Sequence, residues 1–190
     1  MKILVSILSL GLVTLLTVSC VSVRAGAYFG NEKQKSSFDD FSTNTEGIQH
    51  RDPNATRAVE FNTNTSKTGF YVGVFFSDVL PLGDRFDVQP EVNFVGITDL
   101  NQIQAPILAR ITVVDKFNIY AGPNFGYLLD TPAGLNSFNM GADFGVSYDI
   151  LDNLLIESRY TLGISNLLEN GDSNNSVKFS GFTVGAGYRF

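Results

Sequence analysis

The chain ends in Gly181-Phe-Thr-Val-Gly-Ala-Gly-Tyr-Arg-Phe190, and this stretch decides the fold class. Every second position carries a large or apolar side chain, namely Phe182, Val184, Ala186, Tyr188 and Phe190. Glycine, threonine and arginine occupy the positions between them. A period of two is typical of a β-strand that has one apolar face and one small or polar face. Because an isolated strand is not stable in itself, we expect partner strands with the same alternation.

Seven further segments repeat this alternation, which predicts eight strands in all: 21–30, 69–77, 85–97, 103–114, 117–129, 138–150, 153–164 and 180–190. Each is about as long as the 9–11 residues that a tilted strand needs to cross a bilayer, or slightly longer. The links alternate between tight turns at 80–84, 115–116 and 151–152 and longer connections at 31–68, 98–102, 130–137 and 166–179. This alternation is typical of outer-membrane barrels with short periplasmic turns and longer outside loops, and an even strand number places both termini in the periplasm.

The two faces of the predicted strands differ in charge. One face carries Phe, Ile, Val, Tyr, Ala and Pro side chains and no charge, whereas the other carries Arg24, Asp87, Glu91, Arg110, Asp143, Glu157, Arg159 and Arg189. An eight-stranded lumen is just wide enough for side chains or one small ligand, and it cannot hold the whole apolar set. The apolar face therefore contacts lipid. The sequence predicts an all-β fold, an eight-stranded antiparallel up-and-down transmembrane β-barrel; a soluble ligand-binding barrel would need the apolar set inside.

Aromatic residues gather near the strand ends, as in the girdles at the two membrane interfaces. One rim is marked by Phe86, Phe117, Tyr148, Tyr188 and Phe190, and the other by Phe70, Phe94, Tyr127 and Phe138. Two prolines are less easily placed. Proline lacks the N–H that a strand ladder needs, and a closed barrel has no edge, so we expect a bulge or irregular pairing at Pro90 and at Pro123.

Residues 1–20 have the pattern of an export signal, with a positive charge at Lys2 followed by an apolar run. We expect cleavage near Cys20 or Val21, because the predicted first strand starts at Val21. The chain then divides into a signal peptide at 1–20 and a barrel domain at 21–190. The alternatives are a helical membrane anchor and lipidation of Cys20.

Four stretches resemble the outer-membrane β-barrel domain of the PorT-like group: Val23-Arg-Ala-Gly-Ala-Tyr-Phe29, Arg85-Phe-Asp-Val-Gln-Pro-Glu91, Asn118-Ile-Tyr-Ala-Gly-Pro-Asn-Phe-Gly-Tyr-Leu129 and Gly185-Ala-Gly-Tyr-Arg-Phe190. The resemblance covers nearly the whole chain after residue 20. It implies an eight-stranded integral barrel in the outer membrane of a Gram-negative-type cell, without established catalytic residues. The terminal aromatic Phe190 resembles the signal by which the barrel-assembly machinery reads a closing strand. The long 31–68 segment departs from the compact first loop of that group.

The charged face predicts a polar network in the lumen, made of Arg24, Glu91, Arg110, Asp143, Glu157, Arg159 and Arg189. Glu157 and Arg159 are two residues apart and both point inward, and Arg189 on the adjoining strand is expected beside them. Leaving one such ion buried and unpaired costs several kcal/mol, so the carboxylates and guanidinium groups are expected to pair. We favour a plug, in which these charged side chains pair with one another and fill the lumen, over a selectivity filter or a proton path. The reason is that an eight-stranded lumen leaves little room for a column of water.

Other features of the sequence argue against nucleic-acid binding, disulfide bonds, metal sites and catalysis. A net charge of −6 argues against nucleic-acid binding, and a single cysteine excludes an internal disulfide and a cysteine-rich metal site. We predict no catalysis, cofactor or metal; the alternatives are a hydrolase that uses His50, the only histidine, and a calcium site at 169–175. The polar segment 31–68 is expected to be a mobile outside loop that carries an extracellular partner. The sequence favours an integral barrel that contacts outer-membrane lipid and has a structural, adhesion or partner-binding role, with a narrow channel as the alternative.

Overall fold

The computed structural model describes residues 21–39, 58–77, 80–81, 85–98, 100–131, 134–169, 171 and 175–190. Within these ranges one antiparallel sheet contains β1 (Val21–Asp39), β2 (Ala58–Phe76), β3 (Leu80–Pro81), β4 (Phe86–Ile97), β5 (Gln102–Val114), β6 (Phe117–Leu128), β7 (Phe138–Asp149), β8 (Leu154–Gly163) and β9 (Ser176–Arg189). The predicted export segment at 1–20, Cys20 and His50 lie outside the described residues. Across those ranges, no helix is long and apolar enough to cross a membrane.

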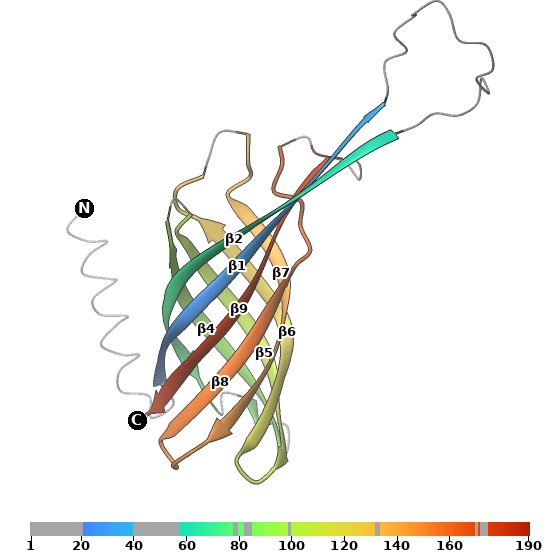
Figure 1. Ribbon diagram of the computed structural model, residues 1–190. Helices are drawn as coiled ribbons and strands as arrows, with labels where there is room; N and C mark the ends of the chain where they lie inside the picture. Colours follow the sequence, from blue (N-terminus) through green and yellow to red (C-terminus); the bar gives the residue numbers. More distant parts are fainter. Residues whose placement is uncertain are drawn as a thin grey trace, which may run out of the picture.

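The sheet closes on itself as an eight-stranded barrel (Figure 1). From β3 to β9 each strand pairs with the next one in sequence, β1 pairs with β2 and β9, and β2 pairs with β4 rather than with β3. The short β3 continues the line of β2, because residues 69–75 of β2 pair with 91–97 of β4 and residues 80–81 of β3 pair with 87–88 of the same strand. The predicted fold class is therefore confirmed. Closure leaves the ladder without an edge within the barrel wall, which is what a strand in lipid requires.

Alternation along the strands sorts the side chains as expected. On β7, Asp143 is 1% exposed, whereas the side chain of the next residue, Phe144, is 52% exposed. The same contrast separates the charge-free outer face from the polar inner face around the wall. Aromatics stand at both ends of the outer face: Tyr188 and Phe190 meet edge to face with ring centres 5.2 Å apart at one end, and Phe70 lies 6.1 Å from Phe94 at the other.

The two ends of the barrel differ in their connections (Figure 1). At one end, here called the turn end, β1 starts, β9 finishes, and the links at 115–116 and 150–153 are tight. Lys116 takes a positive φ of 73° in one of these turns. At the other end, the loop end, the links 129–137 and 164–175 are longer, whereas 98–101 is as short as 150–153.

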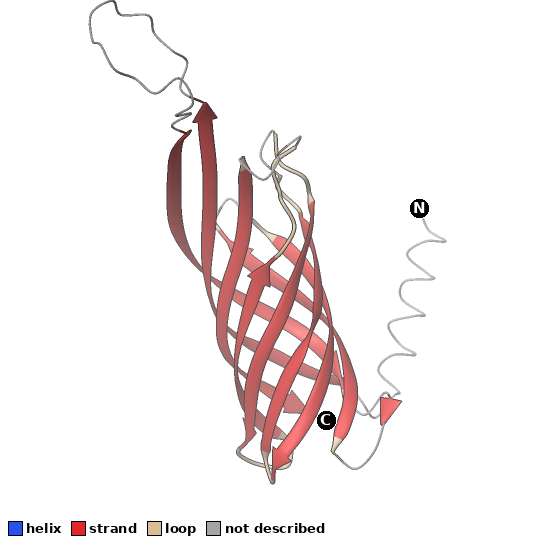
Figure 2. Cartoon of the chain, turned by 90° about the vertical axis from the view of Figure 1, so that its right-hand side faces the viewer, coloured by secondary structure: helices blue, strands red, loops and turns tan. Residues whose placement is uncertain are grey.

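The segment 31–68 differs from the expected mobile loop. Residues 31–39 of β1 and 58–68 of β2 pair with each other and extend the barrel wall as a hairpin that projects beyond the loop end (Figures 1 and 2). β9 also starts earlier than predicted, and its residues 176–180 pair with 31–35 of β1. The strands extend beyond the barrel because their pairing is already established in the wall, so each further residue pair adds hydrogen bonds without the cost of starting a new sheet. The threonines at 63, 65 and 68 also favour a strand. Residues 40–57 lie outside the described ranges.

The two prolines disturb the pairing as predicted, but without a change of register. Pairing of β4 with β5 skips residues 91–92, next to Pro90, and resumes in the same register. Pairing of β5 with β6 skips 107–108 opposite 122–123, where Gly122 allows close approach: a Cβ there would lie 2.1 Å from the carbonyl oxygen of Ile107. The one register shift between β5 and β6 lies instead between Thr112 and Val114, a position that the prolines do not predict.

Candidate functional site

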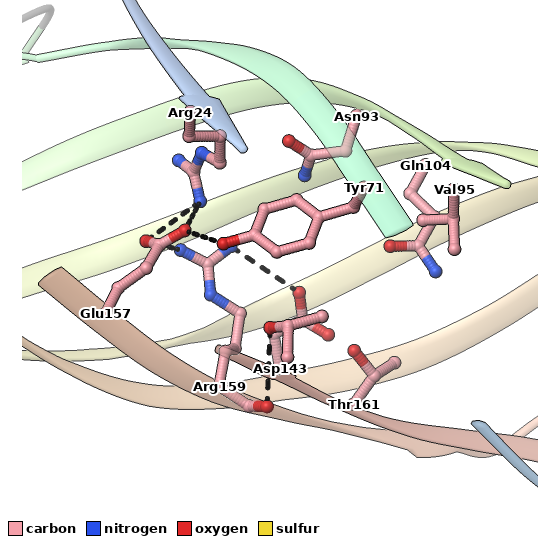
Figure 3. Close-up of a pocket in the computed structure, with 10 residues that line it drawn as sticks. Arg24, Tyr71, Asn93, Val95, Gln104, Asp143, Glu157, Arg159 and Thr161 are labelled. Carbon is pink, nitrogen blue, oxygen red and sulfur yellow. Dashed lines mark hydrogen bonds and ion pairs between the residues drawn. The ribbon is translucent and has the colours of Figure 1, made fainter. Parts of the chain in front are cut away.

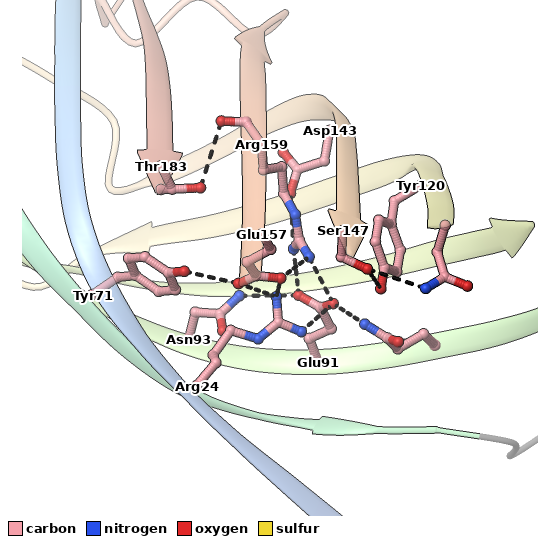
Figure 4. Close-up of polar contacts among 12 residues, drawn as sticks. Arg24, Tyr71, Glu91, Asn93, Tyr120, Asp143, Ser147, Glu157, Arg159 and Thr183 are labelled. Carbon is pink, nitrogen blue, oxygen red and sulfur yellow. Dashed lines mark hydrogen bonds and ion pairs between the residues drawn. The ribbon is translucent and has the colours of Figure 1, made fainter. Parts of the chain in front are cut away.

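A cluster of buried charges crosses the middle of the lumen, and Glu91 of β4 lies at its centre (Figure 4). The Glu91 carboxylate accepts hydrogen bonds from Arg24 Nη2 at 2.5 Å and from Arg159 Nη1 and Nη2 at 2.6 and 3.2 Å. Two amides on the same strand also donate to it, Gln89 Nε2 at 2.7 Å and Asn93 Nδ2 at 3.2 Å. The Glu91 side chain is 0% exposed, so these five bonds replace its hydration.

A second carboxylate, Glu157 of β8, joins the same two arginines (Figure 3). It accepts from Arg24 Nη1 at 3.2 Å and from Arg159 Nη2 at 3.2 Å. The hydroxyl of Tyr71 on β2 donates to Glu157 Oε1 at 2.8 Å. Two guanidinium groups and two carboxylates therefore form a closed ring of charge that ties β1, β4 and β8 together across the lumen.

Neighbouring groups complete the cluster. Asp143 of β7 lies 4.0 Å from Arg159 and accepts two bonds from Asn124 Nδ2, at 2.9 and 3.1 Å. The guanidinium carbons also rest on aromatic faces, that of Arg24 at 4.6 Å from the Phe75 ring centre and that of Arg159 at 5.4 Å from the Tyr120 ring centre. Such contacts stabilise a cation that has lost its water.

Two of the seven predicted network residues lie away from this cluster. Arg110 forms a bidentate pair with Asp87, directly opposite on β4, at 2.9 and 2.5 Å. Arg189 does not lie beside Glu157 and Arg159 as expected; its Nη2 is 3.0 Å from Asp149. The register explains the difference, because Glu157 is opposite Gly185, four residues before Arg189, which places Arg189 near the turn end.

Sequence reasoning missed several members of the network. Gln89, Tyr71 and Asp149 carry polar contacts in the lumen, yet none of them was predicted as part of the network. Their inward position follows from the same two-residue alternation, so the signal was present for Asp149 and for Gln89. Tyr71 is less evident, because a tyrosine on the inner face of a strand is equally compatible with packing.

Glycines make room for the inner tyrosines. A Cβ on Gly185 would lie 2.3 Å from Tyr71 Oη, and a Cβ on Gly181 would lie 2.2 Å from Tyr28 Oη. Each ring therefore occupies space that a side chain on the nearby strand β9 would fill. This accounts for part of the high glycine content of the inward positions.

An apolar cap covers the cluster on the side of the loop end. It consists of buried side chains from the wall and from the loops: Tyr28, Tyr71, Val95, Ile97, Leu100, Leu128, Leu167 and Val177. Two loops are tied together over it, because Asn136 N donates to Leu167 O at 2.6 Å and Glu169 N donates to Gly134 O at 2.9 Å. Leu135 and Leu168 bridge the same loops and pack against the cap.

The residues around the cluster leave a small cavity between them. Beside the charge cluster lies a cavity of about 10 Å³, lined by Arg24, Tyr71, Gln104 and Asp143 among other residues (Figure 3). This is room for about one water molecule. No group of three or more metal-ligating side chains occurs among the residues that the structure describes. The site is therefore a buried charge cluster covered on the loop-end side by the apolar cap.

Comparison with known proteins agrees with this architecture. Residues 95–169 match the family described as outer membrane protein beta-barrel domain. No curated protein matches the chain.

Several solved structures are similar to the chain. A de novo designed transmembrane β-barrel is 12% identical, with 87% of this chain and 96% of the other covered and a TM-score of 0.46. Neisserial surface protein A is 14% identical, with 90% and 97% covered and a TM-score of 0.45. OprG from Pseudomonas aeruginosa is also 14% identical, with 90% and 95% covered and a TM-score of 0.45. Likenesses this distant say nothing about binding or activity.

The closed eight-stranded wall, the charge-free outer belt with aromatics at both ends, and the family match together define the class of protein. The chain is an integral β-barrel protein of the outer membrane.

Proposed function

We propose that this protein is a non-conducting and non-catalytic barrel whose loop end presents a binding or adhesion surface outside the cell. The observation that carries the proposal is the double closure of the lumen. Charged side chains from β1, β4 and β8 meet across its middle, and an apolar layer with two joined loops lies above them. An ion would have to displace both layers to pass.

The proposed orientation places the loop end outside and both termini in the periplasm. Its support is that the loop-end links 129–137 and 164–175 are longer than the turn-end links 115–116 and 150–153, which is the asymmetry of outer-membrane barrels. In this orientation the closing strand β9 ends in the periplasm, where Phe190 is available to the barrel-assembly machinery. We also propose removal of residues 1–20 as a signal peptide and, from the four sequence stretches quoted above, membership of the PorT-like group.

The proposed binding surface is the hairpin of residues 31–39 and 58–68. It extends beyond the wall, and Thr63, Asn64, Thr65 and Ser66 are all exposed on it. Side chains of this kind donate and accept hydrogen bonds without a net charge, and an exposed element on a rigid scaffold is a usual place for recognition.

Two measurements test the proposal. Purified protein in planar bilayers should give no steady single-channel steps, whereas regular large steps from the wild-type barrel would establish the narrow channel instead. Replacing the hairpin by a tight turn between Gly30 and Gly69 should leave a folded, heat-stable barrel and reduce attachment of the cells that display it. Intact attachment by the shortened, folded barrel would move the binding surface to the loop at 164–175.

A further inference from the structure

Two lysines face each other on the outer surface of the barrel, just beyond the aromatic rim of the loop end. Lys33 of β1 is directly opposite Lys178 of β9 in the antiparallel ladder, and both side chains are exposed. The Cβ atoms of directly opposed residues are about 5 Å apart, and like charges in such a pair destabilise the sheet. An unfavourable pair of this kind suggests that a ligand of opposite charge binds between the two lysines.

No carboxylate offsets this pair within the described part of the chain. Neither lysine takes part in an ion pair or hydrogen bond there. The nearest acid in sequence, Glu32, points to the opposite face of β1 because successive side chains alternate. On the other flank, Lys33 is opposite Asn64 of β2, an exposed amide that can donate two further N–H groups. At this level of β1, β2 and β9 the outward face thus presents two ammonium groups and an amide; Lys35, two residues further along the same face of β1, is engaged in an interaction of its own.

The position of these three side chains relative to the lipid-facing surface determines which layer of the membrane they contact. Moving along β1 and β9 toward the loop end, the pairs on the outward side of the alternation are Ala27 with Val184, Phe29 with Phe182, Asn31 with the buried Ser180, and Lys33 with Lys178. The outward face therefore changes from apolar to aromatic, then to small and polar, then to cationic. Phe29 and Phe182 are 47% and 41% exposed and mark the interface.

The height of the lysines above that interface matches the headgroup layer. Four residues of strand rise about 13 Å, which a tilt of roughly 40° reduces to about 10 Å along the membrane normal. The polar layer on each side of a bilayer is about 5–8 Å thick, and a lysine stem bends to place its ammonium several Å lower. Both ammonium groups thus reach the level of lipid phosphates.

We propose that Lys33, Lys178 and Asn64 form a binding site for a lipid headgroup that carries a phosphate monoester. A monoester has a charge of about −1.5 to −2 near neutral pH and three acceptor oxygens, so it can bridge both ammonium groups and accept from the amide. A phosphodiester carries a single charge and matches the pair less well. The site is independent of which end of the barrel faces outside and of whether the lumen conducts.

The test uses the full mature barrel in lipid nanodiscs of phosphatidylcholine, with phosphatidic acid as the monoester or phosphatidylglycerol as the diester added at equal total charge. Retained lipid is counted by native mass spectrometry, and heat-modifiable gel mobility confirms folding. Each surface lysine is worth about a fivefold change in affinity for an anionic lipid, so the double variant K33Q/K178Q should bind phosphatidic acid about 25-fold more weakly than wild type. Lys116→Asn, at the turn end, is the matched control and should bind as wild type; asparagine accepts the positive φ at that position.

The thermal unfolding midpoint is a second measurement, and it distinguishes a lipid-binding site from two lysines that are only exposed. In phosphatidylcholine alone, Lys178→Gln should raise the thermal unfolding midpoint, because it removes the repulsion, and phosphatidic acid should stabilise wild type but not this variant. Equal binding of monoester and diester, or an unchanged affinity in the double variant, would overturn the proposal. Equal stabilisation by inorganic phosphate in phosphatidylcholine discs would make this a free-anion site and overturn the lipid assignment.

Discussion

The substitution Glu91→Gln tests the charge cluster most directly. Glutamine keeps the shape of glutamate, so the change removes one negative charge and replaces one acceptor oxygen with an NH₂ group. One oxygen of Glu91 accepts from Arg24 and Arg159, and the other accepts from Arg159 as well. Whichever way the new amide is turned, its NH₂ group therefore faces a guanidinium N–H. The result is a clash of donors beside an excess positive charge.

The expected loss of stability follows from the burial of the cluster. The Glu91 side chain is 0% exposed, and the Arg24 and Arg159 side chains are 1% and 5% exposed, so water cannot take over the lost contacts. Breaking one partner of a buried ion pair costs about 3–5 kcal/mol of unfolding free energy. We expect a loss in this range for Glu91→Gln. The double variant Glu91→Gln/Arg24→Gln should lose less than the sum of its two single variants, because it removes a charge of each sign.

The assay is equilibrium unfolding of the purified barrel from lipid vesicles in guanidinium chloride, followed by tyrosine fluorescence and gel mobility. Glu169→Gln is a suitable control, since Glu169 is exposed at the loop end and a surface change of this kind is worth at most about 0.5 kcal/mol. If Glu91→Gln changes stability no more than the control does, the cluster is hydrated and weak, and the argument for a closed lumen loses its main support.

Three further outcomes are expected. Glu157→Gln should destabilise the barrel by about 3–5 kcal/mol, because its ion pairs are buried. Arg189→Gln should cost less than about 1 kcal/mol, because its ion pair with Asp149 is partly exposed. Equal losses of unfolding free energy in the same assay would contradict the separation of the two sites. Gly185→Ala should cost about 1–3 kcal/mol, because its methyl group would lie 2.3 Å from the Tyr71 hydroxyl and 2.4 Å from the backbone oxygen of Ala25. An unchanged midpoint would show that both the ring and the backbone of β1 yield easily at this point. Edman sequencing of protein isolated from outer membranes should give a start near Val21; a mature chain that starts after residue 27 would lack the part of β1, residues 21–27, that pairs with β2 and β9 at the turn end, and would contradict the prediction.

The barrel itself could be predicted because its signal is local. Whether a residue faces lipid or lumen depends on the two-residue period of its own strand, and that period is written in each segment separately, as in Phe144 beside Asp143. The tight turn with Lys116 and the disturbed pairing at Pro90 are also local, since they depend on backbone preferences of one or two residues. The sequence alone was sufficient for these features.

The hairpin was missed because polarity was given more weight than continuity of pairing. Segment 31–68 has too few apolar residues to order itself, and in isolation that reasoning is sound. In the barrel, however, residues 31–39 and 58–68 extend strands that are already aligned by β1 and β2. Once a ladder of paired strands has formed, it can be extended by any two segments that are already in register. The amino-acid composition of a segment contains no information about its register.

The sequence by itself determined which residues line the lumen, and the tertiary structure decided which of them meet. Arg159 and Glu91 are 68 residues apart, on β8 and β4, and they come within hydrogen-bond distance only because the wall curves until these two strands face each other across the lumen. Arg189 lies on the same face as Arg159 yet pairs with Asp149, because the register of β8 with β9 sets its height along the barrel. Alternation fixes the direction of a side chain, a local property, whereas contact across a lumen depends on register, tilt and closure, which only the whole sheet possesses.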